Sequence, residues 1–258
     1  MAAHPDLEAA LAAVDGWGAT HAAAAVVDPS GVLASHGPVG HRFRLASVTK
    51  LLAAHACLVA VEEGTLDLDA PAGPEGSTVR HLLAHASGLG FDTGVLSPPG
   101  RKRIYSNTGY DALADHLAQR SGMPAEEYVT AAVLDPLGMA DTDLADRSLA
   151  HGAYGTVTDL GRFAAELHAP RPVHATTLAD VLPGVGPQDP MDWGLGFEIR
   201  DHKSPHWTGT TCSPETFGHF GGAGTFLWLD PGRHVALVVL TDREFGDNLG
   251  VRTYLLPA

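Results

Sequence analysis

The sequence of 258 residues is poor in cysteine, in basic residues and in long apolar runs, and each shortage excludes a class of protein. No segment reaches the ~18 consecutive apolar residues that indicate a membrane-spanning helix. The two cysteines, Cys57 and Cys212, are too few for a disulfide framework. Lysine and arginine total 16 against 30 acidic residues, a formal net charge of −14. This charge disfavours nucleic acid and anionic membranes as partners, because both bind basic surfaces.

The start of the sequence also lacks the pattern of a secretory signal. The first lysine or arginine is Arg42, and the apolar run at 22–27 is too short for the apolar core of a signal peptide. With 45% hydrophobic and 18% charged residues, the composition is that of a globular chain that buries a sizeable core. We therefore expect a cytoplasmic protein.

Hydrophobic periodicity divides the chain into ends rich in strands and a middle rich in helices. The pattern predicts two strands around the turn at 28–31, a helix from about Ser47 to Glu63, and C-terminal strands in WGLGFEIRD, GTFLWLD and HVALVVLTD. Between them, several amphipathic segments with Gly or Pro stops predict helices and loops.

This arrangement predicts a single domain, residues 1–258, of the α/β (α+β) class. Residues 1–70 and 191–258 would form an antiparallel sheet flanked by helices, and residues 71–190 an inserted all-helical subdomain. The cleft between the two parts is the expected site.

One of the three lysines lies within the apolar run FRLASVTKLLAAHACLVA at 43–60. Lys50 follows Ser47 by three residues, so on a helix the two side chains share a face. A serine hydroxyl is a weak nucleophile until a base removes its proton, and a lysine whose pKa is lowered by burial is such a base. The structural alternative is a lysine that extends to solvent and a serine that caps the helix. For Ser-x-x-Lys alone this alternative is favoured.

Two further motifs follow in the chain. YSN at 105–107 comes after a Pro-Gly turn and before a helix, and HFGG at 219–222 directly precedes a strand. Ser-x-x-Lys, Tyr-x-Asn and basic-x-Gly in this order resemble the motifs of the penicillin-recognising serine hydrolases, which have a β-lactamase/transpeptidase-like fold. The class C β-lactamase-like branch, with its D-aminopeptidases and family VIII esterases, is the most similar. Connecting segments such as TVRHLLAHASGLG, DPLGMADT and YGTVTDLGRF resemble that branch as well.

The resemblance implies that Ser47 is acylated, with Lys50 and Tyr105 acting together as general base. The Lys50 ammonium would lower the pKa of Tyr105, which is otherwise too weak a base at neutral pH. Asn107 would hold Lys50 and contact the substrate. Singly, Tyr105 could pack on a loop and Asn107 could cap a helix; the family order of all three motifs favours the catalytic interpretation.

The third motif supplies the remaining implied roles. The backbone N–H groups of Ser47 and Gly222 would form the oxyanion hole. His219, Phe220 and Gly221 would bind substrate, and the missing side chain at Gly221 would let it approach the strand edge. β-Lactamases and carboxypeptidases of this family usually carry Lys-Thr-Gly here, and a neutral histidine followed by phenylalanine lacks that cation and hydroxyl. We therefore expect neutral esters or amides as substrates.

The main hypothesis is a serine hydrolase that cleaves small esters or amides. A β-lactamase or D-Ala peptidase-type amidase, an acyltransferase that uses the same acyl-enzyme, and a non-catalytic relative are the alternatives. His81 and His85, one turn apart in HLLAH, lack the adjacent Glu of a zinc helix, so we expect no metal and no cofactor. The expected partner is a small molecule, and the sequence leaves the oligomeric state open.

Overall fold

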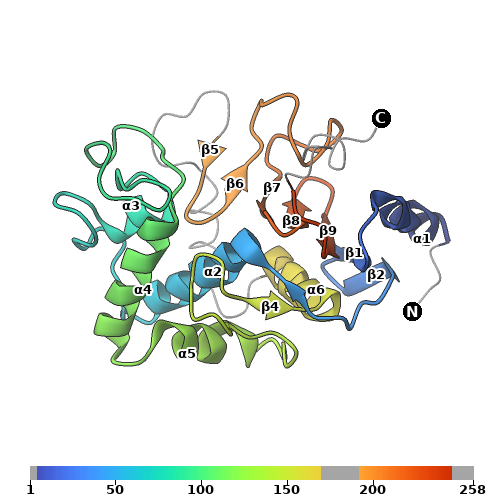
Figure 1. Ribbon diagram of the computed structural model, residues 1–258, viewed down its shortest axis with the longest axis horizontal. Coiled ribbons are helices and arrows are strands. Elements are labelled where there is room, and N and C mark those ends of the chain that lie inside the picture. The colour runs from blue at the N-terminus through green and yellow to red at the C-terminus, as the bar shows by residue number, and fades with distance from the viewer. Residues whose placement is uncertain (1–4, 170–191, 246–258) are drawn as a thin grey trace.

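The computed structural model describes residues 5–169 and 192–245, which are built around a seven-stranded antiparallel sheet (Figure 1). The strands follow one another across the sheet in the order β2-β1-β9-β8-β7-β6-β5. Their bounds are β1 (Ala22–Asp28), β2 (Gly31–His36), β5 (Asp192–Trp193), β6 (Glu198–Ile199), β7 (Phe217–Gly221), β8 (Thr225–Asp230) and β9 (Val235–Thr241). Two short strands, β3 (Phe43–Arg44) and β4 (Tyr154–Gly155), form a separate pair.

Strands from the N-terminal and C-terminal parts of the chain pair within the sheet. Strand β1 pairs with β9 from Ala22↔Thr241 to Val27↔Ala236, and with β2 on its other side. The predicted hairpin at 28–31 is present. The antiparallel sheet predicted from both ends of the chain is therefore confirmed.

Helices cover both faces of this sheet and extend beyond it. They are α1 (Pro5–Leu11), α2 (Thr49–Glu62), α3 (Val79–Leu83), α4 (Asn107–Ser121), α5 (Ala125–Val129) and α6 (Val157–His168), with short turns η1 (Ala12–Trp17), η2 (Ala46–Val48) and η3 (Thr130–Leu134). Alternate residues of β1 face opposite sides: Ala23 and Ala25 join the main core, whereas Ala24 packs with Leu11 and Val14 at the N-terminal helix.

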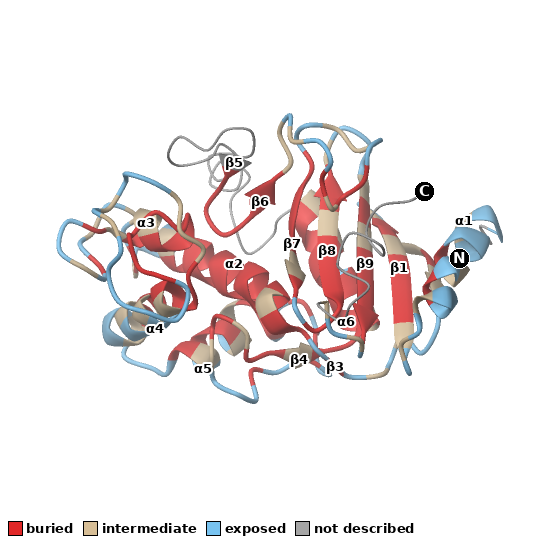
Figure 2. Cartoon of the chain, turned by 45° about the horizontal axis from the view of Figure 1, so that its top comes forward, coloured by how far each residue is buried: buried red, intermediate tan, exposed pale blue. Residues whose placement is uncertain are grey.

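Helix α2 is buried from Thr49 to Ala60, as Figure 2 shows along its length. A helix enclosed on every side needs apolar residues all around, which explains why its sequence is a continuous apolar run with no amphipathic stripe. The helix predicted from Ser47 to Glu63 is thus present, but it begins with the separate 3₁₀ turn η2, which contains Ser47.

Helix α6 lies against β1 and β9 rather than with the other helices of the middle segment. The Thr156 side chain caps it by accepting the N–H of Asp159 at 3.1 Å. A Cβ at Gly161 would lie 2.9 Å from Val32 Cγ2, so glycine allows the close approach of α6 to the sheet. The subdomain boundaries at 70/71 and 190/191 remain a prediction.

Two local predictions are corrected by the structure, and a third is extended. WGLGFEI is two short strands, β5 and β6, separated by a turn in which Gly196 has φ +99°, a conformation that favours glycine. HFGG precedes strand β8, as predicted, but its residues 219–221 themselves lie in β7, a strand that the sequence analysis did not predict. His81 and His85 do not share a helical turn, since α3 ends at Leu83 and His85 has φ +55°. Within the described residues, no helix combines the length and apolarity needed to cross a membrane.

Candidate active site

Ser47 lies in the turn η2, directly before the buried helix α2. Its neighbour Ala46 has φ +47°, a left-handed conformation that is strained for a residue with a side chain. Both backbone polar groups of Leu45 are hydrogen-bonded. Its N–H donates to the Ala153 carbonyl at 2.9 Å, and its carbonyl accepts from Thr225 Oγ1 at 2.8 Å. These bonds fix the turn and place Ser47 at the N-terminal end of α2.

Lys50 is fully buried, at 0% exposure, at the start of α2. Its Nζ donates to Asn107 Oδ1 at 2.7 Å and to the Ala150 carbonyl at 2.8 Å. Burial lowers the pKa of Lys50 to about 7, against smaller opposing effects of nearby carboxylates. A neutral amine has two N–H bonds, and these two acceptors satisfy both, so its lone pair remains available to take a proton.

Tyr105 lies between Lys50 and His219. Lys50 Nζ is 4.8 Å from the centroid of the Tyr105 ring, and Tyr105 Oη is 3.0 Å from His219 Nε2. His219 Nδ1 accepts the Phe220 N–H at 2.8 Å. Nε2 therefore carries the imidazole proton and donates it to Tyr105 Oη. Tyr105 Oη accepts that bond, and the side chain of Ser47 is a second polar neighbour that favours the ionised form of Tyr105.

The pKa of Tyr105 differs from the sequence prediction. Burial raises it above the ordinary value, although the hydrogen bond with Ser47 lowers it in part. The prediction that the Lys50 ammonium lowers this pKa is wrong, since burial of the phenol outweighs any such effect and Lys50 itself loses its charge near neutral pH. Tyr105 is thus a neutral phenol at physiological pH, and Lys50 is the better base.

Burial also lowers the pKa of His219 to about 3, with a further contribution from the charge of Lys50. The imidazole is therefore neutral at physiological pH, as the sequence predicts. The Lys-Thr-Gly cation of related enzymes has no charged counterpart at this position. His219 bonds to Tyr105 and also lines the cavity described below.

Asn107 is positioned by the loop that precedes α4. Its N–H donates to the Phe91 carbonyl at 2.8 Å, and its Nδ2 donates to Asp92 Oδ1 at 3.0 Å. The amide oxygen is thereby turned towards Lys50, as the resemblance implies. Capping of α4 is done by Ser106, whose side chain accepts a backbone N–H of the first turn at 2.8 Å.

Gly221 lets strand β7 approach the serine. A Cβ at this position would lie 3.1 Å from the Ser47 backbone nitrogen and would collide with the Leu45 carbonyl. Gly222 follows at the end of β7 and lines the same cavity as Ser47. The structure therefore brings together the two residues implied for the oxyanion hole, and that role remains a prediction.

A cavity of about 410 Å³ opens beside Ser47. The sequence analysis did not identify four of its lining residues: Phe91, Trp193, Glu198 and Lys203. Trp193 and Glu198 lie within WGLGFEI, and Phe91 follows the family-like ASGLG segment, so those segments were the available signal. The full lining consists of Ser47, Phe91, Tyr105, Trp193, Glu198, Lys203, His219, Phe220 and Gly222.

Aromatic contacts hold Tyr105 in this lining. Its ring centroid lies 4.5 Å from that of His85, 5.8 Å from that of Trp193 and 5.9 Å from that of Phe91. His85 is buried, and its Nδ1 accepts the Ser106 N–H at 3.1 Å. The wall behind the predicted catalytic groups is therefore rigid and apolar.

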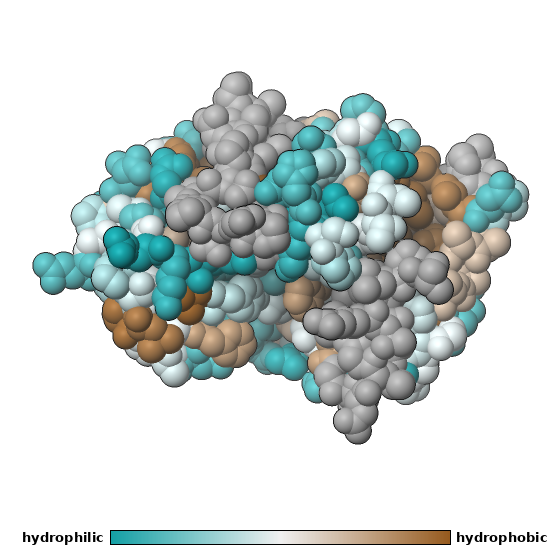
Figure 3. Space-filling view, turned by 90° about the horizontal axis from the view of Figure 1, so that it is seen from above, coloured by the Kyte–Doolittle hydropathy of each residue, from teal (hydrophilic) through white to brown (hydrophobic). Residues whose placement is uncertain are grey.

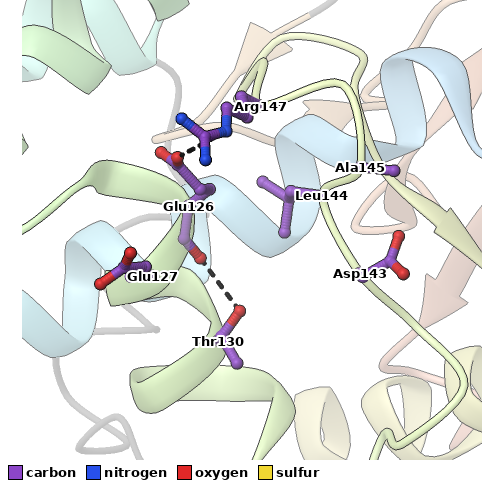
Figure 4. Close-up of a pocket in the computed structure, with 7 residues that line it drawn as sticks. All are labelled: Glu126, Glu127, Thr130, Asp143, Leu144, Ala145 and Arg147. Atoms are coloured by element: carbon purple, nitrogen blue, oxygen red, sulfur yellow. Dashed lines mark hydrogen bonds and ion pairs between the residues drawn. The ribbon is translucent and has the colours of Figure 1, made fainter.

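A second hollow, of about 330 Å³, lies between α5 and the segment 143–147 (Figure 4). Arg147 Nε lies 3.4 Å from Glu126 Oε1, and Thr130 Oγ1 donates to the Glu126 carbonyl at 3.0 Å. The lining of this second hollow shares no residue with that of the cavity beside Ser47.

On the face shown in Figure 3, hydrophilic residues predominate and hydrophobic ones form separate small patches.

The chain matches a known family over nearly its whole length. The family model described as Beta-lactamase aligns with residues 10–256. The chain therefore belongs to the Beta-lactamase family, and the resemblance to the penicillin-recognising serine hydrolases is confirmed, as is the fold.

Individual relatives agree with this assignment. The chain is similar to a β-lactamase from Mycobacterium bovis, with 51% identity, a TM-score of 0.89 and coverage of 95% of each chain. EstCE1, a hydrolase with promiscuous acyltransferase activity, has a TM-score of 0.80 and 18% identity over 94% of this chain and 93% of its own, which shows a shared fold alone. Penicillin-binding protein 4* of Bacillus subtilis is 29% identical over 157 residues, 46% of this chain and 35% of that protein. The chain spans less than half the length of the curated relatives it matches.

Proposed function

We propose that this protein is a serine hydrolase that forms an acyl-enzyme on Ser47 and cleaves small esters or amides. The observation that carries the proposal is the state of Lys50. A buried amine with a pKa of about 7, bonded to Asn107 and Ala150 and close to the start of the same helix as Ser47, is suited to accept a proton.

In the proposed first step, Ser47 Oγ attacks the substrate carbonyl carbon while its proton passes to the Lys50 amine, with the Tyr105 hydroxyl between them. The carbonyl oxygen becomes an oxyanion, which the N–H groups of Ser47 and Gly222 would stabilise. The bond to the leaving group then breaks, and the leaving group takes the proton from Lys50.

In the second step, water replaces the leaving group. It gives a proton to the same amine as it attacks the ester on Ser47, and the carboxylic acid product departs as Ser47 regains its proton. Because the third motif has a neutral imidazole, His219, in place of the usual lysine, the proposal favours neutral esters or amides over β-lactams and D-Ala peptides, whose carboxylates need such a cation. Lys203 lines the cavity as well, so this preference requires a direct test.

The test is hydrolysis of p-nitrophenyl butyrate by the wild type and by Ser47→Ala, with intact-mass measurement of the acylated protein. We expect turnover and a transient acyl adduct in the wild type and neither in the variant. Equal turnover by both proteins would contradict the assignment of Ser47. A chromogenic cephalosporin measured alongside tests the substrate class, since efficient cleavage would favour the β-lactamase alternative. A folded wild type that forms no acyl adduct with either compound would favour the non-catalytic alternative.

Acyl transfer is the second candidate. The aromatic side chains of Phe91, Trp193 and Phe220 line the cavity and offer an apolar surface on which an organic alcohol or amine would compete with water for the acyl-enzyme. EstCE1, which shares the fold, is described as having such activity. Product analysis with added alcohols distinguishes the two reactions, because transfer yields a new ester.

Cys57 and Cys212 are both free thiols, which supports our proposal that the protein works in the reducing cytoplasm.

A further inference from the structure

One charged side chain in the cavity has no part in the proposed acyl transfer. Glu198, on β6, is 4% exposed and lines the same cavity as Ser47. A carboxylate buried to this degree is costly unless a donor or a cation compensates it. Glu198 therefore needs a structural or a functional explanation.

His206 provides part of the compensation. Its Nε2 lies 3.0 Å from Glu198 Oε1, and His206 is itself 3% exposed. Its other ring nitrogen, Nδ1, accepts the Thr208 N–H at 3.4 Å, so Nε2 carries the proton and donates to the carboxylate. Burial raises the pKa of Glu198, but the bond from His206 and the nearby His219 and Lys203 together lower it below the ordinary value. The carboxylate is therefore ionised at neutral pH.

The second carboxylate oxygen remains available. Within residues 5–169 and 192–245, the recorded hydrogen bonds of this carboxylate involve Oε1, which leaves Oε2 as an acceptor. Glu198 lines a cavity whose other walls include the side chains of Phe91, Trp193 and Phe220. Aromatic faces and a carboxylate both attract an organic cation.

Among the described residues, the other titratable groups near the cavity oppose this charge to different degrees. His219 is neutral, and Lys50 is half deprotonated at neutral pH and lies behind the lining. Arg103 stacks on Trp193, 5.2 Å from its ring, and is not part of the lining. Lys203 is half-buried in the same lining and its charge lowers the pKa of Glu198, so a cationic substrate would compete with Lys203 for this carboxylate.

We propose that Glu198 selects substrates that carry a positive charge, such as an ammonium group, for the cavity beside Ser47. This inference rests on the proposed function, because it treats that cavity as the substrate site. The neutral His219 of the third motif would not repel a positively charged substrate, whereas Glu198 would repel a substrate that carries a carboxylate.

The test compares three ligands of one shape: benzylammonium, benzyl alcohol and benzoate. Binding to the wild type and to Glu198→Gln is measured by calorimetry, and inhibition of p-nitrophenyl butyrate hydrolysis is measured in parallel. The amide introduced by Glu198→Gln retains an oxygen that accepts from His206, and Glu215→Gln, an exposed position in the connection between β6 and β7, is the matched control. We expect benzylammonium to bind about tenfold more tightly than the other two in the wild type and in the control, and this preference to vanish in Glu198→Gln.

The outcomes separate this inference from the proposed function. Ester hydrolysis without any preference for benzylammonium overturns the role of Glu198 and leaves the hydrolase intact. Glu198-dependent binding of benzylammonium without ester hydrolysis supports the cation site and contradicts the esterase. Tighter binding of benzoate that is lost in Lys203→Met would assign selectivity to Lys203 instead. The wild-type comparison alone decides the matter if Glu198→Gln fails to fold.

Discussion

Asp92 fixes the orientation of Asn107, because Asp92 Oδ1 accepts the Asn107 Nδ2 hydrogen bond at 3.0 Å. The opposite end of the amide, Oδ1, then accepts from Lys50 Nζ at 2.7 Å. A flipped amide would present N–H groups to the lysine and leave its proton without an acceptor. An exposed carboxylate thus controls the environment of a fully buried amine.

Replacement of Asp92 tests this relationship. Asp92→Ala removes both the acceptor and the charge that raises the pKa of Lys50, so we expect kcat to fall about tenfold and the pH at half-maximal kcat to move down. Asp92→Asn keeps an acceptor oxygen, so kcat at its plateau should be retained while the pH profile still shifts. Asp146→Ala, at an exposed carboxylate elsewhere, is the control. Profiles that coincide for all four proteins would contradict the role of Asp92.

The pH dependence of kcat reports the protonation of Lys50. The amine accepts a proton only in its neutral form, so kcat should rise with pH and reach half its maximum at about 7. Lys50→Ala should lower kcat by ~100-fold or more and abolish this rise. A flat profile in the wild type between pH 6 and 8.5 would show that a different group is the base.

Tyr105→Phe distinguishes the two possible bases. We expect kcat to fall by ~100-fold or more, because the hydroxyl between Ser47 and Lys50 is lost. The rise of the residual activity at about pH 7 should persist, since burial raises the pKa of Tyr105 and Lys50 is the titrating group. If the rise disappeared with the hydroxyl, the base would be the tyrosinate and our assignment would be wrong. Full activity in the variant would require a search for another base.

Gly221→Ala tests the close approach of β7 to Ser47. The added methyl would collide with the Leu45 carbonyl and lie 3.1 Å from the Ser47 nitrogen. We expect kcat to fall by ~100-fold and the free energy of unfolding to fall by about 1–3 kcal/mol. Gly222→Ala serves as the control for stability, because a Cβ there has open space, and its melting temperature should match the wild type. Wild-type activity in Gly221→Ala would exclude a tight oxyanion site at this strand.

His55 should make the protein sensitive to acid. It is 0% exposed, neither ring nitrogen has a hydrogen-bond partner among the described residues, and burial lowers its pKa from 6.5 to about 4. The unfolded chain therefore binds this proton below pH 6.5, whereas the folded chain binds it below about 4. The stability that the neutral ring permits is complete above pH 6.5 and is lost as the pH falls towards 4.

Substitution of His55 measures this effect. His55→Leu keeps the volume and removes the titration. Relative to the wild type, the free energy of unfolding of the variant should therefore be about 2 kcal/mol more favourable at pH 5 than at pH 7.5, which corresponds to roughly 5 °C in Tm. His202→Leu, at an exposed side chain, is the control and should show no such change. An equal Tm difference at both pH values would mean that His55 does not titrate on unfolding.

Local patterns in the sequence predicted much of the fold. The apolar run around Lys50, the turn at 28–31 and the Thr156 cap depend on neighbours along the chain, so they were predictable. The division of WGLGFEI into two strands was not, because the conformation of Gly196 depends on packing against α2. The order of the three motifs identified the family, and the family resemblance in turn identified Ser47 and its proposed partners.

What the sequence could not predict depends on contacts between distant segments. The pKa of Tyr105 is raised by burial, and one ring that packs on it, Trp193, comes from a distant part of the chain. Glu198 is a single acidic residue in a strand until the cavity places it beside Ser47. Each of these facts concerns three-dimensional neighbours, and a motif contains no information about them.

The bond from Thr225 Oγ1 to the Leu45 carbonyl joins residues 180 positions apart and holds the turn that carries Ser47. On the ribosome, the nucleophile emerges long before strand β8 is synthesised. A nascent chain that ends before Thr225 contains Ser47, Lys50 and Tyr105 but has neither this bond nor the β7 glycines fully in place. The contact that holds the turn around Ser47 is therefore among the last that the growing chain is able to form.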